Sequence, residues 1–186
     1  LGYAFDGWYT EETFENKTTG IESGSYGNKT FYAKWTAIVY KINYELNGGN
    51  NNDNNLASYT IESETITLAN PSRTGYSFSG WYTESTLKNK VTVIANGSYG
   101  DKTYYAKWTA VVYKINYELN GGNNNSENPA NYTKESEKIT LANPSKTGYD
   151  FDGWYTESTF ENKTTGIESG SYGNKTFYAK WTAVVY

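Results

Sequence analysis

One sequence feature constrains this chain more than any other: it repeats itself at a fixed interval of 73 residues. The strings GYAFDGWYTE, GYSFSGWYTE and GYDFDGWYTE begin at positions 2, 75 and 148, and YAKWTA begins at positions 32, 105 and 178. A fixed period of this length is typical of a tandem array of small structural units. The phase of the repeat predicts three domains, which are the C-terminal half of a repeat at 1–39 and complete repeats at 40–112 and 113–186.

The repeated unit is rich in residues that favour strands. Aromatic residues make up 18% of the chain although its mean hydropathy is −0.78, and disordered chains are poor in aromatics. Apolar and polar residues alternate over 113–119, which predicts a half-buried strand. Further strands are expected at 138–141, 148–156 and 175–185, and a short helical turn is expected at 157–163. The fold class predicted from these elements is a β-rich α+β fold with little helix.

The boundary between neighbouring repeats contains no turn residue. Apolar residues occupy the even positions of 103–110 and the odd positions of 111–119, and the text runs without interruption as TYYAKWTAVVYKINYEL. A strand that changes its buried face without breaking must pass from one core to the next or contain a bulge. We therefore expect nearly continuous strands between repeats, stiff junctions, and a rotation between adjacent repeats.

The half-repeat 1–39 lacks the first strands of the unit. We expect Trp8, Phe14 and Trp35 to lose core partners. The segment should then be less ordered than 40–186, or be completed by another chain through strand addition. A domain frame running from Gly75 to about Ser145 is the alternative.

The order LNGG, GYxFxGWYTE and YAKWTA over 73 residues resembles the Listeria–Bacteroides repeat, also called the internalin B-type repeat. The resemblance covers both complete repeats, and 1–39 resembles the second half. It implies a compact β-grasp-like fold that occurs in tandem in secreted or wall-anchored bacterial surface proteins. It also implies roles in spacing, adhesion and recognition of host partners, without enzymatic activity or any residue-level motif.

Composition excludes several classes of function. The chain has no His and no Cys, so His–Cys or Ser–His–Asp catalysis and His or thiolate metal sites are excluded. A net charge of −4 with a single arginine, Arg73, disfavours binding to nucleic acid. No apolar run approaches the roughly 20 residues that span a bilayer. We expect no enzyme activity and no cofactor, and the missing initiating Met and signal sequence predict a piece of a longer chain.

Acidic residues could form a calcium site or a catalytic pair, but the sequence gives little support to either. The Asn-rich loops at 50–55 and 123–128 carry one carboxylate each, Asp53 and Glu127, whereas calcium takes roughly six to eight oxygen ligands. Asp150 and Asp152 could form a carboxylate pair, but the second repeat has serines at those positions. A calcium site and a catalytic pair are therefore both disfavoured.

Tyrosines are the candidate binding residues. Tyr105 shares a strand face with threonines and a lysine, so alternation predicts that it and its equivalents point outward, and surface tyrosines suit glycan and protein partners. The residues selected are Tyr32, Tyr105, Tyr178, Tyr82 and Tyr155. The favoured function is a semi-rigid extracellular stalk on a bacterial surface that presents an adhesive domain. The alternative is a module that binds a host receptor or glycan through these tyrosines, with avidity from the number of repeats.

Overall fold

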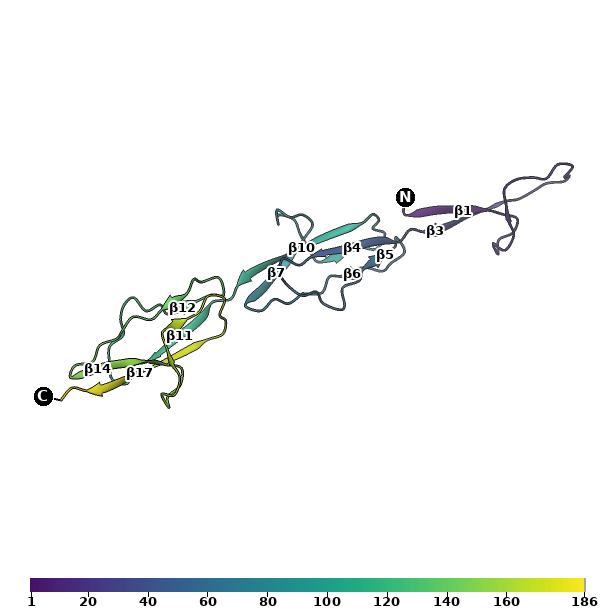
Figure 1. Cartoon of the computed structure of the whole chain (residues 1–186). Helices are drawn as coiled ribbons and strands as arrows, with labels where there is room; N and C mark the ends of the chain where they lie inside the picture. Colours follow the sequence, from purple (N-terminus) through teal and green to yellow (C-terminus); the bar gives the residue numbers. More distant parts are fainter. Residues whose placement is uncertain (186) are drawn as a thin grey trace. The chain divides into compact units, whose positions relative to one another are not determined.

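The computed structural model describes residues 1–185, and every regular element within them is a β-strand (Figure 1). The expected α+β class is therefore wrong, and the chain is all-β. Tyr186, the last residue of the third predicted domain, lies outside the described residues. None of the described segments is a helix that could cross a membrane.

The helical turn expected at 157–163 is instead a bend and turn that lead into a strand. The carboxylate of Glu157 accepts hydrogen bonds from the backbone N–H groups of Glu161, at 2.8 Å, and Asn162. Phe160 has a φ of 56°. A side chain that captures these N–H groups competes with helical hydrogen bonds, and a left-handed residue ends any helical run.

The second repeat forms a five-stranded sheet and a two-stranded sheet. Its strands are β4 (Tyr40–Glu45), β5 (Ser58–Tyr59), β6 (Ile66–Thr67), β7 (Tyr76–Tyr82), β8 (Lys90–Val91), β9 (Val93–Ile94) and β10 (Lys102–Ala110). The large sheet has the order β5-β4-β10-β7-β8, and β6 pairs with β9. β10 runs parallel to β4, so the first and last strands of the repeat lie side by side.

The third repeat has the same topology. Its strands are β11 (Tyr113–Glu118), β12 (Asn131–Tyr132), β13 (Ile139–Thr140), β14 (Tyr149–Tyr155), β15 (Lys163–Thr164), β16 (Gly166–Ile167) and β17 (Lys175–Ala183). The large sheet has the order β12-β11-β17-β14-β15, and β13 pairs with β16. β17 is parallel to β11 and antiparallel to β14, with a register shift between Phe151 and Gly153 that marks a bulge.

The half-repeat forms a three-stranded sheet of order β2-β1-β3. Its strands are β1 (Tyr3–Tyr9), β2 (Lys17–Thr18) and β3 (Tyr32–Ala37). They correspond to β14, β15 and β17 of the third repeat. Trp8 and Trp35 are 47% and 58% exposed, which confirms the expected loss of core partners. The expectation is wrong for Phe14, because its ring packs edge-on against Tyr9.

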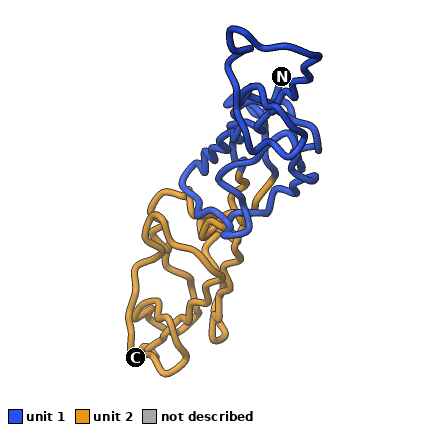
Figure 2. Tube along the Cα trace, turned by 90° about the vertical axis from the view of Figure 1, so that its right-hand side faces the viewer, with its two compact units in different colours: residues 1–71, 80–107 blue, residues 72–79, 108–186 orange. Residues whose placement is uncertain are grey.

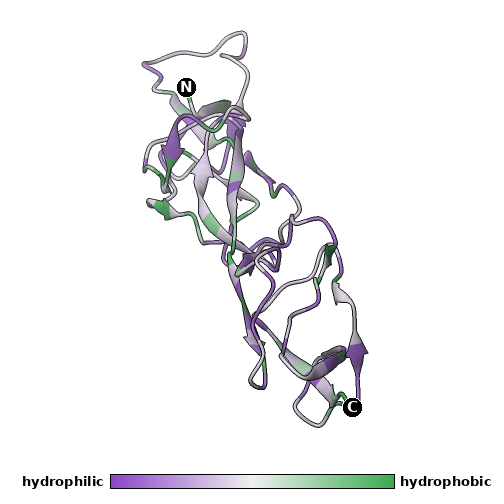
Figure 3. Ribbon diagram, turned by 90° about the vertical axis from the view of Figure 1, so that its left-hand side faces the viewer, coloured by the Kyte–Doolittle hydropathy of each residue, from purple (hydrophilic) through white to green (hydrophobic). Residues whose placement is uncertain are grey.

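The sequence alternation matches the burial of the strands. In β11, Ile115 is buried and Tyr113 and Tyr117 are half-buried, whereas the lysine, asparagine and glutamate between and after them are exposed. Burial raises the pKa of Tyr117 to about 12. Hydrophilic and hydrophobic residues accordingly alternate at short range along the ribbon (Figure 3). One face of each large sheet thus packs on a core.

The core of the third repeat lies between its large sheet and the β13–β16 pair. Its buried members are Ile115, Tyr132, Leu141, Trp154, Ile167, Phe177 and Ala179. The second repeat buries the residues that precede these by 73 positions, namely Ile42, Tyr59, Leu68, Trp81, Ile94, Tyr104 and Ala106. The same sequence positions therefore build the same core in both complete repeats.

Neighbouring repeats are joined by very short steps between strands. Two residues, 111–112, separate β10 from β11, and two residues, 38–39, separate β3 from β4. The backbone N–H of Val111 donates to the carbonyl oxygen of Gly75 at 3.0 Å, and Ile38 donates to Gly2 at 2.9 Å in the same way. Nearly continuous strand connections are thus confirmed, whereas stiffness and rotation of the junctions remain predictions.

Contacts divide the chain into two compact units, which are residues 1–71 with 80–107 and residues 72–79 with 108–186 (Figure 2). The division passes through β7 and β10. One end of each of these strands therefore groups with the third repeat. Within this second unit the Lys134 ammonium group donates to the carbonyl oxygen of Thr74 at 3.2 Å, so the loop after β12 contacts the segment just before β7.

Candidate binding surface

The predicted tyrosines lie on the sheet face opposite the core. Tyr155 of β14 pairs in register with Tyr178 of β17. Trp154 and Ala179 form the next pair and are buried, so alternation places the two tyrosines on the other face. Both tyrosines are half-buried. The structure thus brings together two residues that the sequence alone had assigned to separate strands.

The same pairing occurs in the other repeats. Tyr32 of β3 pairs in register with Tyr9 of β1, which is buried. Tyr82 and Tyr105 occupy the equivalent positions of β7 and β10 and are half-buried. We call these pairs the tyrosine face, defined by Tyr9 with Tyr32, Tyr82 with Tyr105, and Tyr155 with Tyr178.

A lysine lies over one tyrosine of each pair. The Nζ atom of Lys180 is 5.5 Å from the ring centroid of Tyr155, and that of Lys107 is 5.6 Å from Tyr82. In the half-repeat the corresponding lysine is 5.3 Å from Tyr9. A cation held over an aromatic ring at this distance is attracted by the ring's electron density. The tyrosine face is therefore partly covered by the chain's own cations.

An apolar side chain from the following loop covers the outer edge of the tyrosine face. The ring of Phe160 contacts Tyr155 edge-on at 5.5 Å between centroids. Phe14, Leu87 and Phe160 have φ values of 56°, 53° and 56°. Non-glycine residues rarely adopt this conformation, so the loop holds it in every repeat. Sequence reasoning missed these residues, although an apolar residue recurs five positions after each of the three tyrosines that end the GWY strings.

A glutamate fixes this loop. The carboxylate of Glu84 accepts hydrogen bonds from the backbone N–H groups of Lys88 and Asn89 at 2.7 and 2.6 Å. It also accepts a hydrogen bond from the hydroxyl of Thr83 at 2.5 Å. This hydroxyl bond and the N–H groups lower the pKa of Glu84 to about 2, and the pKa of the equivalent Glu157 is lowered for the same reasons. The ionised carboxylate is therefore part of the loop's structure.

A groove lies beside the tyrosine face of the third repeat. It has a volume of about 490 Å³, and its aromatic rings come from Tyr149, Phe160, Tyr178 and Trp181. Glu118 and Lys180 are among its charged lining residues. Aromatic rings can stack on the apolar faces of sugar rings while charged groups hydrogen-bond to hydroxyls. The groove therefore offers the chemistry that a small polar ligand such as a glycan would need.

The Asn-rich loops have a structural role that sequence reasoning did not find. The side chain of Asn128 donates to the carbonyl oxygen of Ala142 at 3.0 Å and accepts from its N–H at 2.7 Å. Asn55 makes the same two contacts with Ala69 in the second repeat. Each asparagine thus ties the Asn-rich loop to an alanine, Ala142 or Ala69. This alanine lies two residues after the short strand β13 or β6.

The two aspartates weighed as a catalytic pair have different surroundings. Asp152 accepts a hydrogen bond from the hydroxyl of Thr182 at 2.8 Å, and Asp150 is exposed. Within residues 1–185, no three His, Cys, Asp or Glu side chains gather as metal ligands would.

Comparison with known proteins agrees with the repeat period. The Listeria-Bacteroides repeat domain matches residues 1–34, 40–107 and 113–180. Two proteins of Evansella cellulosilytica are each 32% identical to the chain, over 100% and 97% of its length. They are provisionally named a Gly-rich membrane protein and a membrane protein, and the chain spans only 21% and 27% of them.

A search of solved structures returned domains 3 and 4 of the Streptococcal High Identity Repeats in Tandem of a cell surface protein. They are 19% identical, with 78% of this chain and 98% of that chain covered and a TM-score of 0.25. The family assignment is carried by the sequence match, which extends over most of the chain. The chain belongs to the Listeria-Bacteroides repeat family and contains one partial and two complete copies of its repeat.

Proposed function

We propose that this chain is a non-enzymatic spacer segment of a bacterial cell-surface protein, where it holds a binding domain away from the cell. The observation that carries the proposal is the two-residue step between β10 and β11, together with the backbone hydrogen bond from Val111 to Gly75. A step this short leaves no room for a flexible Gly/Ser-type tether. Repeats joined in this way add length with each copy.

Three further facts support the spacer function. Near-identical copies allow length to vary by whole repeats, since residues 1–40 differ from 147–186 at only four positions. The absence of His and Cys from the whole sequence removes the commonest catalytic side chains. Membrane proteins among the relatives support a location at the cell envelope.

A display experiment tests the spacing function. The chain is placed between a surface anchor and a small binding domain, with one, two or three complete repeats. Accessibility of the binding domain to a bulky antibody should rise with each repeat. It should rise less when residues 111–112 and their equivalents are replaced by longer Gly/Ser linkers that make the junctions flexible. Accessibility that is independent of repeat number would contradict a spacing function.

The groove beside Tyr178 favours a second candidate function, recognition of a glycan or host receptor. The test is binding of the chain to a glycan array and to a panel of receptor ectodomains. Replacement of Tyr105 and Tyr178 by serine should abolish binding if the tyrosines carry it. A specific signal that the double variant loses would place recognition ahead of spacing, and a signal that it retains would exclude the tyrosines.

A further inference from the structure

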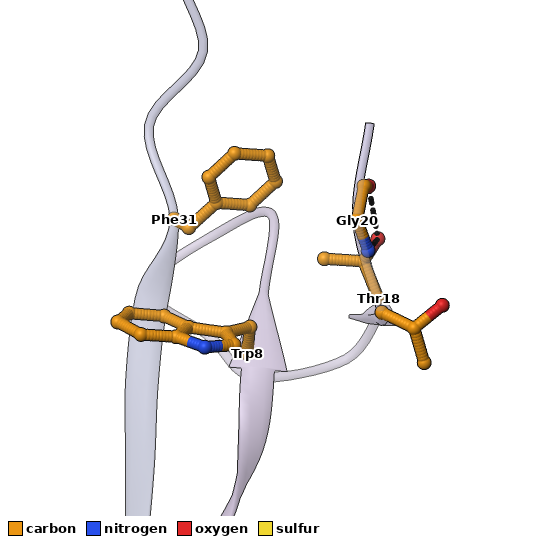
Figure 4. A pocket seen from close by; sticks show the side chains of 5 residues that line it. Trp8, Thr18, Gly20 and Phe31 are labelled. Atoms are coloured by element: carbon orange, nitrogen blue, oxygen red, sulfur yellow. Dashed lines mark hydrogen bonds between the residues drawn. The ribbon is translucent and has the colours of Figure 1, made fainter. Parts of the chain in front are cut away.

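The groove of the third repeat differs from a cavity of the half-repeat in the charges that line it. The cavity has a volume of about 250 Å³ and is lined by Trp8, Phe31 and residues 18–20, none of which is charged (Figure 4). The groove beside Tyr178 has a volume of about 490 Å³ and holds charged groups among its aromatic rings. A carboxylate and two ammonium groups line it, and they belong to Glu118, Lys146 and Lys180. The groove can therefore distinguish ligands by their charge as well as by their shape.

The two ammonium groups are held in place without a negative partner. Nζ of Lys146 donates to the carbonyl oxygen of Asn120 at 2.8 Å and lies 4.1 Å from the ring centroid of Tyr149. Nζ of Lys180 lies 5.8 Å from the ring centroid of Phe160. Neither lysine forms an ion pair with any of residues 1–185. An ammonium group has three N–H donors, so each lysine keeps donors and a full charge for a ligand.

The charges of the groove recur in the second repeat, although other surface charges do not. The second repeat has Arg73 and Lys107 at the positions of the two lysines, and Glu45 at the position of the carboxylate. An exposed position outside the groove changes sign, from Lys88 in the second repeat to Glu161 in the third. The replacement of lysine by arginine keeps the positive charge. Charge is therefore the property that the two copies share at this position.

The exposure of the groove residues does not depend on where the chain ends. Another repeat follows the second repeat, and the equivalent residues there have the same degree of burial. The ring and charge positions that agree in this way are Tyr105 and Tyr178, Trp108 and Trp181, Arg73 and Lys146, and Glu45 and Glu118. The exposed rings and charges are therefore a property of the repeat itself.

We propose that this groove binds a sugar that carries a carboxylate, an inference that rests on the second candidate function, glycan recognition. The apolar face of the sugar ring stacks on Tyr178 and Trp181. The carboxylate pairs with Lys146 and Lys180, and Glu118 accepts hydrogen bonds from hydroxyl groups of the sugar. The volume of the groove, about 490 Å³, falls within the roughly 300–1,000 Å³ that is typical of small-molecule sites.

An acidic sugar fits these groups better than a neutral sugar or a polyanion. A neutral sugar would displace water from two ammonium groups without supplying a negative charge in its place, which costs free energy. A polyanion such as nucleic acid would be repelled by the chain's net charge of −4. A single carboxylate on an otherwise neutral sugar meets the local positive charge and avoids most of this repulsion. Such sugars include sialic acids of host cells and muramic acid of bacterial walls, so the test distinguishes these two sources.

The test titrates two matched pairs of sugars into the full chain, in which only tryptophan is labelled with ¹⁵N. Sialyllactose is paired with lactose, and N-acetylmuramic acid is paired with N-acetylglucosamine, so the neutral member of each pair lacks the group that bears the carboxylate. The indole signal of Trp181 should move with at least one acidic sugar and should move little with its neutral partner. The signal of Trp154, which is buried in the same repeat, should stay in place. The acidic sugar with the larger effect at equal concentration identifies the source.

Variants of the chain identify the charged groups. Lys146→Gln combined with Lys180→Gln should weaken binding of the acidic sugar by roughly tenfold or more, because it removes charge-assisted hydrogen bonds. Lys114→Gln combined with Lys138→Gln makes the same change in net charge at exposed positions outside the groove, and should bind as the unsubstituted chain does. Retained dispersion of the tryptophan indole signals verifies that each variant is folded.

Three results would overturn the proposal. Equal movement of the Trp181 signal with the acidic and neutral members of both pairs would exclude a role for the carboxylate, although glycan recognition itself would stand. Equal binding by the two double variants, whether weakened or not, would exclude a specific role for the lysines of the groove. No movement with any of the four sugars would exclude an acidic-sugar site in the groove, whereas receptor recognition is decided separately by the ectodomain panel.

Discussion

At the scale of single residues, one tryptophan position shows that a side chain's contribution to stability depends on the residues packed around it. Trp8, Trp81 and Trp154 occupy the same place in three copies of the repeat. Trp81 and Trp154 are 1% and 2% exposed, and their indole N–H groups donate to carbonyl oxygens of Ala69 and Ala142. Trp8 lacks both the burial and the acceptor. The sequence is the same, so the difference lies in packing.

Truncation of these tryptophans should therefore have unequal effects. Trp154→Ala should reduce the free energy of unfolding of the third repeat by about 3–5 kcal/mol, because it leaves a large cavity. Trp8→Ala should reduce local stability by about 1 kcal/mol or less. Hydrogen exchange of the backbone amides of Ala179 and Ala33, the cross-strand partners of the two tryptophans, measures both effects. Equal losses would show that Trp8 is as well packed as Trp154.

Asn120 provides a second prediction at this scale. It has a φ of 49°, which asparagine tolerates better than most residues, and its side chain donates to the carbonyl oxygen of Ala179 at 2.8 Å. Asn120→Ala should cost about 1–3 kcal/mol, since it strains the turn and leaves a partly buried carbonyl oxygen unpaired. Asn116→Ala, on the exposed face of β11, is the control and should change urea stability little. A similar cost for both would indicate that the turn does not depend on this side chain.

At the scale of elements, the long strands and one short strand, β13, could be predicted from sequence, whereas the other short strands could not. β11, β14 and β17 show alternation or aromatic runs, and their bounds fall within two residues of the expected ones. The two-residue strands β12, β15 and β16 are too short to show a period. Their positions depend on contacts between segments distant in sequence.

The loop after β14 shows why the helix prediction was wrong. Its composition allows a helical turn, but the carboxylate of Glu157 captures the N–H groups of the residues that would continue it. Phe160 then adopts a left-handed conformation that places its ring on Tyr155. The sequence predicted that the tyrosines share the face opposite the core. It did not predict that they form pairs, that a lysine lies over each pair, or that a side chain from the next loop covers it, because these contacts depend on the strand register. Residue type alone does not specify that register.

Acidification tests the role of the glutamate in this loop. The pKa of Glu84 is lowered from its ordinary value of 4.5 to about 2, mainly by the Thr83 hydroxyl and the N–H of Asn89. A lowered pKa in the folded state stabilises the loop above pH 4.5, and this contribution is lost as the pH falls toward about 2. The titration midpoint of the Glu84 carboxyl carbon, followed by NMR, should lie near the lower value. A midpoint near 4.5 would show that the carboxylate does not hold the loop.

The Glu84→Gln variant is the matched control for the acidification experiment. Its amide oxygen can still accept the N–H groups of Lys88 and Asn89, but it carries no charge and does not titrate. Hydrogen exchange of those two amides should be faster than in the unsubstituted chain at neutral pH. The variant's loop should also show no further increase in exchange between pH 4.5 and about 2, whereas the loop of the unsubstituted chain should open in that range.

The bulge of β14 gives a further prediction for this element. Gly153 has a φ of 145°, and a Cβ atom there would lie 2.2 Å from Cε of Lys163. Gly153→Ala should destabilise the third repeat by about 1–3 kcal/mol through its backbone conformation. The double variant with Lys163→Ala removes the clash and should recover only part of the loss in urea unfolding. Full recovery would mean that the lysine, and not the backbone, makes glycine necessary.

At the scale of the whole molecule, the proposed spacer function depends on the joints between repeats. Each described joint is a two-residue step between strands, with a backbone hydrogen bond from the step to the glycine that precedes the aromatic strand. Within the second unit, Lys134 adds a contact between the third repeat and Thr74. We expect joints of this kind to restrict motion more than a polar linker would. A spacer needs this restriction, whereas a set of independent binding modules does not.

The most direct test of this claim is the distribution of distances between spin labels on adjacent repeats. The chain has no cysteine, so Lys88→Cys and Glu161→Cys, exposed and equivalent positions, can be labelled without background. Electron–electron double resonance should give one narrow distance peak. A variant with glycine at positions 111 and 112 and several glycines inserted between them should give a broad one. A broad distribution in the unsubstituted chain would contradict the account, because the repeats would then move independently of one another.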